Sequence, residues 1–253
     1  MTAVRRFDHQ VGFDLLMFRR NPAAAFFTLI LPLIFFLLFI SIFGNQTDDN
    51  GVRLATYYVP GIMTLQVTSA TLVNLAMAMT TRRERGLLKR LRATPLPPWV
   101  FIASQAAASI VISAVASVVL IAVGWLLFDV SVRAAGIPSL VISLALGAAS
   151  LAALGLALST VIPSEEAAPA ITNVLVLPLY FISDVFIPGD KPRVLEVIAS
   201  IFPVQHLATA LQPAFEPGLV GVTWPWRDWA VLVAWGLFGV VVARSRFRWV
   251  PSR

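Results

Sequence analysis

The densest group of charged side chains lies in one short stretch, Thr81–Trp99, which reads TRRERGLLKRLRATPLPPW. Six cations and one acid, Glu84, occupy the eleven positions from Arg82 to Arg92. If these positions are helical, the basic stripe comprises Arg82, Arg85, Lys89 and Arg92, and the apolar stripe comprises Leu87, Leu88 and Leu91. Such side chains offer ion pairing and apolar contact rather than covalent or metal chemistry. A loop that only marks membrane topology needs cations, but it needs neither a leucine stripe nor Glu84 followed by Gly86.

A second group of polar side chains lies within a long apolar run. Its members fall on roughly one face of a helix and are Thr64, Thr68, Thr71 and Asn74. They either line a path through the membrane or bond to neighbouring helices, and both interpretations stay open at this point.

Two ionisable residues stand apart from these groups. Asp184 lies at the outer end of a predicted span that prolines interrupt, and an ionisable residue at membrane depth is a candidate for substrate binding or gating. Its proline, glycine and acidic neighbours at 188–190 favour a place in the interface instead. His206 has no second His, Cys or carboxylate at metal-ligand spacing, so we expect an ordinary interfacial histidine and no metal site.

The composition indicates the environment in which these residues act. The 253 residues are 58% hydrophobic and 13% charged, whereas a soluble domain is about a quarter charged. The mean hydropathy is +0.83. The absence of Cys excludes disulfides, Cys-ligated metal centres and thiol catalysis. The net charge of +6 does not indicate a nucleic-acid partner, because the basic residues lie at the edges of apolar runs rather than along one groove-sized face.

The apolar runs predict an all-α integral membrane protein, since about 20 apolar residues cross the roughly 30 Å hydrocarbon core. We expect six spans, at residues 22–44, 56–80, 99–128, 137–162, 167–187 and 228–243. Residues 1–21 form an interfacial helix in this interpretation, because Phe7, Val11, Leu15 and Phe18 make one apolar stripe among arginines. Residues 81–98 form a cytoplasmic loop. The proline-rich segment 188–227 is an outer segment that either lies on the surface or re-enters the membrane.

The distribution of Lys and Arg sets the orientation. With both termini in the cytoplasm, 14 of the 19 basic residues face inward, and eight acids accompany the other five. An odd number of spans would put the two basic ends on opposite sides. We therefore expect a multi-pass protein of the cell (plasma) membrane with both termini cytoplasmic.

The chain resembles the permease subunits of type-2 ABC exporters, the daunorubicin-resistance-like group. These show an acid–x–Gly step, a basic-Leu segment and Thr-Pro between spans two and three; here the matching positions are Glu84, Gly86, Lys89, Arg90, Leu91, Thr94 and Pro95. Further likeness lies in Arg19–Pro22, Phe181–Pro188 and Phe202–His206. Two positions depart from the pattern. The family usually has a small residue at the position of Asp184 and a basic residue at the position of Gln212.

The resemblance implies a single transmembrane domain that exports a hydrophobic or amphipathic substrate such as a drug, lipid or glycan. The loop residues Glu84, Gly86, Leu87, Leu88, Lys89, Arg90, Leu91 and Arg92 would dock on a separate cytoplasmic ATPase, which would hold the ATP and magnesium. The chain itself contains no G-x-x-x-x-G-K-[ST] phosphate loop, so we expect no bound cofactor and no enzyme activity of its own. A second permease copy, or a sister permease, would complete the translocator. A lipid-modifying enzyme using Asp184 or His206, or a non-transporting scaffold, are the alternatives.

Overall fold

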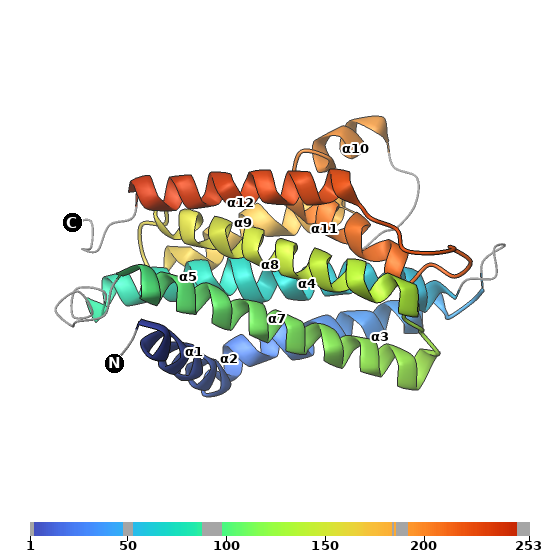
Figure 1. The fold of residues 1–253 in the computed structure, drawn as a ribbon, viewed down its shortest axis with the longest axis horizontal. Helices are drawn as coiled ribbons and strands as arrows, with labels where there is room; N and C mark the ends of the chain where they lie inside the picture. Colours follow the sequence, from blue (N-terminus) through green and yellow to red (C-terminus); the bar gives the residue numbers. More distant parts are fainter. Residues whose placement is uncertain (1–2, 48–52, 88–97, 184, 186–191, 247–253) are drawn as a thin grey trace.

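The computed structural model is a bundle of helices that run side by side (Figure 1). It describes residues 3–47, 53–87, 98–183, 185 and 192–246. Helix α1 and the last residues of α12 lie at the same end of the bundle, called the proximal end here; the opposite end is the distal end. The Asp184 position and most of the predicted basic-Leu segment lie outside the described residues.

Among the described residues, five helices are long and apolar enough to cross a membrane, and their bounds are Pro22–Phe43, Leu54–Glu84, Val100–Phe128, Ala134–Ser159 and Trp226–Arg246. The first is assembled from α2 (Pro22–Ala25), the π-helical η1 (Phe26–Ile30) and α3 (Leu31–Phe43). The second joins α4 (Leu54–Thr68), the π-helical η2 (Ser69–Val73) and α5 (Asn74–Glu84). The others are α7 (Pro98–Phe128), the 3-10 turn η3 (Ala134–Gly136) with α8 (Ile137–Ser159), and α12 (Trp226–Arg246). The all-α integral membrane fold expected from the sequence is thus confirmed.

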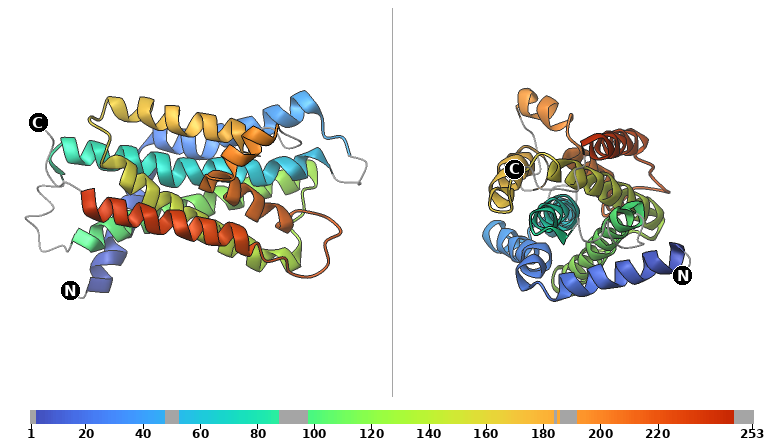
Figure 2. Two further views of the ribbon diagram at one scale, coloured as in Figure 1. Left: turned by 90° about the horizontal axis from the view of Figure 1, so that it is seen from above. Right: turned by 90° about the vertical axis from the view of Figure 1, so that its left-hand side faces the viewer.

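The predicted fifth span is shorter in the described residues. Helix α9 (Ala167–Ile182) has 16 residues, which is below the about 20 that a straight crossing needs. It nevertheless runs along the bundle beside the longer helices and contacts α5 and α11 (Figure 2). Its last backbone bond is the Ser183 N–H to the Leu179 carbonyl oxygen, after which Ser183 is extended.

The segment after α9 is bent, as its prolines suggest. Helix α10 (Arg193–Ala199) and helix α11 (Pro203–Leu211), which η4 (Gln212–Ala214) extends, meet at 95°. Pro203 occupies the first turn of α11, where a missing N–H costs nothing. Together the pair forms either a broken span or a re-entrant loop, and it lies at the distal end (Figure 1).

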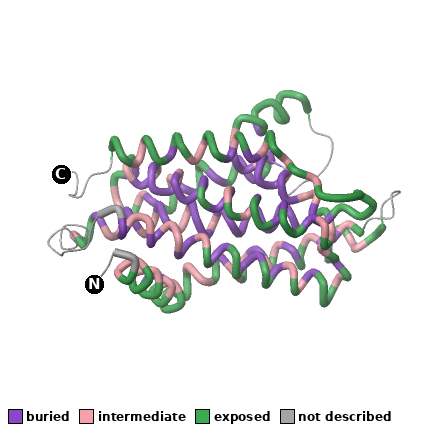
Figure 3. Tube along the Cα trace, viewed as in Figure 1, coloured by how far each residue is buried: buried purple, intermediate pink, exposed green. Residues whose placement is uncertain are grey.

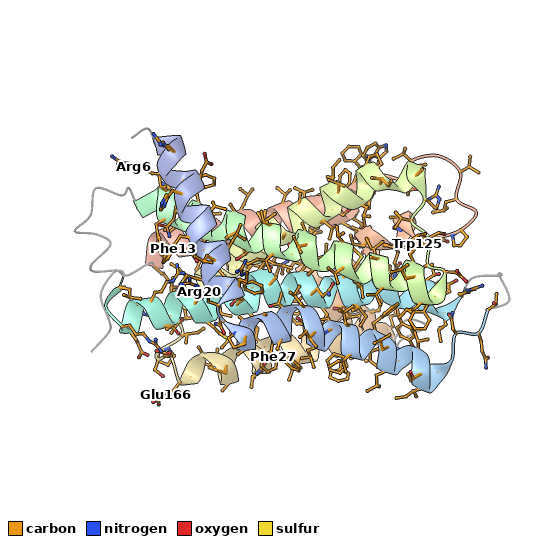
Figure 4. All side chains as sticks on the ribbon, turned by 90° about the horizontal axis from the view of Figure 1, so that it is seen from below. Arg6, Phe13, Arg20, Phe27, Trp125 and Glu166 are labelled. Carbon is orange, nitrogen blue, oxygen red and sulfur yellow. The ribbon has the colours of Figure 1, made fainter. Side chains whose placement is uncertain are left out.

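Helix α1 (Ala3–Arg19) lies crosswise to the bundle at the proximal end, as Figure 4 shows through its labelled residues. The turn after it is fixed by Asn21, whose side-chain oxygen accepts a hydrogen bond from the Ala24 N–H at 3.1 Å and so caps the helix that begins at Pro22. The interfacial place of residues 1–21 stays a prediction, and the structure shows where the apolar stripe of α1 lies. Its four residues are half-buried on the side of α1 that packs on α7, and the exposed apolar residues are Phe13, Leu16 and Met17.

The centre of the bundle is formed by α4–η2–α5 and α8. The percentages that follow are the buried share of the 18-residue stretch of each helix that could cross a membrane. This share is 72% for the Leu54–Glu84 helix and 61% for the Ala134–Ser159 helix, against 17% for α12 (Figure 3). The small residues of α8 permit this position. A Cβ added to Gly155 would lie 2.6 Å from the Leu72 carbonyl oxygen of η2, so the two backbones touch at that point.

Candidate functional site

Helix α5 continues through Arg82 and Arg83 and ends at Glu84. The Arg85 N–H bonds to the Thr81 carbonyl oxygen and the Gly86 N–H to that of Arg83, and Gly86 then adopts a φ of +67°. Left-handed glycine is the usual way for a helix to end. Arg82 and the residues after Gly86 therefore do not share one continuous helix. Lys89 and Arg92, the other members of the expected basic stripe, lie outside the described residues, so the stripe stays a prediction.

Arg82, the first of these cations, pairs with the N-terminal helix. Its Nη2 lies 3.1 Å from Oδ1 of Asp14, and its guanidinium lies over the Phe101 ring, 5.5 Å from the centroid. The Asp14 side chain is only 2% exposed, and it also accepts weaker bonds from Gln10 Nε2 at 3.3 Å and Ser104 Oγ at 3.4 Å. A buried carboxylate needs such partners, so this ion pair fixes α1 to α5 and α7.

Arg83 points the other way, to the end of α8. Its Nη1 donates to the Ser159 carbonyl oxygen at 2.7 Å, and its Nη2 donates to the Ile162 carbonyl oxygen at 2.5 Å. The last carbonyls of a helix have no partner within the helix and carry partial negative charge. A buried guanidinium therefore satisfies them and joins α5 to the C-terminal end of α8.

Glu84 and Arg85 both reach the connection between α8 and α9. A Glu84 carboxylate oxygen accepts a hydrogen bond from the backbone N–H of Glu165 at 2.5 Å. The Arg85 guanidinium binds both carboxylate oxygens of Glu165, at 2.7 and 3.2 Å. These bonds raise the pKa of Arg85 further above its ordinary value, so it stays charged.

Arg82–Arg85 and these partners are called the junction below. Four consecutive residues contact α1, α7, the end of α8 and the α8–α9 connection, all at the proximal end of the bundle. The sequence drew attention to Glu84 and its cations, but it did not indicate Asp14 as a partner. The sequence does contain a sign that Asp14 needs a partner. Asp14 lies on the same helix face as Val11, Leu15 and Phe18, where an unpaired charge would be costly.

The match to known proteins covers most of the chain. The sequence model described as "ABC-2 type transporter" matches residues 12–215, a range that includes the junction, α8 and α11. The chain belongs to the ABC-2 type transporter family. It is 25% identical over 198 residues to the daunorubicin resistance ABC transporter permease protein DrrB1 of Streptomyces coeruleorubidus, covering 78% of this chain and 70% of that protein. It is 21% identical over 226 residues to the putative transport permease YvfS of Bacillus subtilis (strain 168), covering 89% and 90%.

The second group of polar side chains of this ABC-2 permease, Thr64, Thr68, Thr71 and Asn74, lies inside the bundle. Thr64, Thr68 and Thr71 are fully buried, and each hydroxyl donates to the carbonyl oxygen four residues earlier, at 2.6–2.9 Å. Thr residues in apolar helices commonly bond in this way. Asn74 is half-buried at the start of α5. The hydroxyls therefore bond to their own helix, and a role in a path stays a prediction.

The two outer candidates differ in what the structure describes. Asp184 lies outside the described residues. His206 of the permease is 4% exposed and has both ring nitrogens engaged, by Asp228 and by the Ser200 carbonyl oxygen. Neither nitrogen is left to act as a base on a lipid, so the geometry gives no support to the enzyme alternative.

Proposed function

We propose that this ABC-2 permease forms the translocation path for export of a hydrophobic or amphipathic substrate, driven by a separate ATPase. The ATPase would dock at residues 81–98 and would supply the ATP and magnesium chemistry. A second copy or a sister permease would complete the path. The name of DrrB1 concerns daunorubicin resistance, which favours a drug-like substrate here, beside lipid and glycan.

The junction is the observation that carries this proposal. Arg82 holds α1 and α7, Arg83 holds the end of α8, and Glu84 with Arg85 holds the start of the connection to α9. A displacement applied just after Gly86 would therefore reach several helices at once. Because helices transmit motion as nearly rigid rods between packed contacts, this arrangement suits a docking loop that changes the shape of the whole bundle.

The test is Glu84→Arg in the permease–ATPase complex, reconstituted in vesicles. The substitution removes the acceptor of the Glu165 N–H and adds a fourth cation to Arg82, Arg83 and Arg85. This should detach α5 from the α8–α9 connection. We expect transport to fall several-fold while ATP hydrolysis persists. The measurement is transport and ATP hydrolysis in the same vesicles, normalised to the amount of assembled complex.

Two variants serve as controls. Glu84→Gln keeps an oxygen that accepts from the Glu165 N–H, so it should retain most transport. Glu166→Arg makes the same charge change at an exposed neighbouring position (Figure 4) and should resemble the wild type. Wild-type transport by the Glu84→Arg complex would show that residues 81–98 only mark topology.

A further inference from the structure

At the distal end, His206 connects three elements. Its Nδ1 lies 2.6 Å from Oδ1 of Asp228 in the first turn of α12, and its Nε2 lies 2.9 Å from the Ser200 carbonyl oxygen at the end of α10. The same Asp228 oxygen accepts a bond from the Thr209 hydroxyl at 3.0 Å. The His206 and Asp228 side chains are 5% and 19% exposed.

The partners of this ring determine its protonation state. A carboxylate and a carbonyl oxygen only accept, so both ring nitrogens must donate if both contacts are to be hydrogen bonds. A neutral imidazole has a single N–H, and its other nitrogen would then face an oxygen lone pair. With Asp228 ionised, the contacts are therefore those expected of the doubly protonated, positively charged ring.

The surrounding charges agree with this assignment. On α12, Asp228 faces the ring, and Arg227 precedes it in the chain. The other helices that pack on α11, which are α4, α8 and α9, contain no Asp, Glu, Lys, Arg or His, and their tyrosines are neutral near pH 7. On α10 the charged residues are Arg193 and Glu196, and both are exposed.

We propose that a proton on His206 holds the α10–α11 segment against α12, and that loss of this proton loosens the distal end of the permease. The group of His206, Asp228, Thr209 and the Ser200 carbonyl is called the distal latch. Deprotonation removes the ion pair and leaves one ring nitrogen opposite an acceptor. The pH on that side of the membrane would then control how easily the α10–α11 segment moves.

The direction of the pH dependence follows from the ion pair with Asp228, which exists only while the ring carries its proton. Stabilisation by the latch is therefore present at acidic pH and is lost as the ring deprotonates at alkaline pH. Other contacts remain at high pH, because the Trp235 indole N–H donates to the Ile201 carbonyl oxygen at 2.8 Å. The segment should therefore loosen around His206 without leaving α12.

The first experiment measures the ring directly. The chain has two histidines, and His9 is exposed on α1, so His9→Gln leaves His206 as the single ring to observe. In the detergent-solubilised, 15N-histidine-labelled variant, we expect both His206 nitrogens to stay protonated above pH 6.5. If His206 loses its proton at a pH equal to or below that at which an exposed histidine loses its own, about 6.5, the proposal is overturned.

The second experiment measures the apparent Tm of the permease between about pH 6 and 9. For a chain of this size we expect the apparent Tm to fall by about 2–4 °C or more on alkalinisation. His206→Gln and Asp228→Asn should each remove this fall, whereas His9→Gln should keep it. An unchanged pH slope in His206→Gln would contradict the latch. Neither readout needs an ATPase or a substrate, so failure here is separate from failure of the exporter proposal.

Discussion

Asp14 shows how a single residue determines the arrangement of the proximal end. It lies on the face of α1 that packs on α7, with its carboxylate almost completely buried. A charge at such a position is stable only with a partner, and Arg82 supplies it across 68 residues of sequence. The pair adds to the packing of α1 on α7 and also fixes α1 to the end of α5.

Replacing Asp14 by Ala should therefore destabilise the permease. Arg82 would lose its partner while remaining mostly buried, and the expected cost is about 3 kcal/mol, the lower end for breaking a buried ion pair because Arg82 is 18% exposed. The apparent Tm should fall by roughly 6–12 °C. Asp8→Ala removes an exposed carboxylate from the same helix and should leave the Tm nearly unchanged. Equal Tm values for the two variants would show that the Asp14–Arg82 pair does not hold α1.

Among the helices, α8 has the central place because its small residues allow two neighbours to approach closely. At Gly155 its backbone meets the Thr71 and Leu72 carbonyl oxygens of the π-helical η2. On the other side, a Cβ on Gly239 of α12 would lie 2.7 Å from the Ala153 carbonyl carbon. These contacts are between backbones, so neither neighbour can yield by rotating a side chain.

Gly155→Ala should consequently cost about 1–3 kcal/mol, the usual penalty for overpacking a core. The added methyl group would have to displace η2, and the apparent Tm should fall. Gly12→Ala is the matched control, because nothing lies within 4 Å of its added Cβ and alanine is the better helix former. A Gly155→Ala protein as stable as the Gly12→Ala protein would mean that α8 and η2 are not in backbone contact.

The whole molecule has a proximal end with the junction and a distal end with the α10–α11 segment (Figure 1). The basic residues of α1, the end of α5 and the end of α12 all lie at the proximal end. Because basic residues concentrate on the cytoplasmic side, the proximal end is expected to face the cytoplasm.

Single cysteines can test this orientation, since the natural chain has none. Val220 is 98% exposed near the distal end, and Glu166 is exposed at the proximal end. In intact cells, a membrane-impermeant maleimide should label Val220→Cys and should label Glu166→Cys only after the membrane is permeabilised. Labelling of Glu166→Cys alone in intact cells would invert the topology and place the junction outside.

The sequence alone determined the membrane class, the long apolar helices and the cap at Asn21. These are local properties: the length of an apolar run must match the hydrocarbon core, and Asn followed by Pro suits a helix start wherever it occurs. The family resemblance carried by Glu84, Gly86 and the neighbouring basic-Leu segment was equally local, because it depends on residues close together in the chain.

Only the tertiary structure decided how the charges pair and which helix faces are inside. Asp14 with Arg82, Arg83 with the Ile162 carbonyl, and His206 with Asp228 join segments whose register depends on how packed helices meet side by side. For the same reason periodicity identified the apolar stripe of α1 but not α7 as the helix on which it packs. A helical pattern identifies a face that must be buried, but lipid and protein satisfy that pattern equally well.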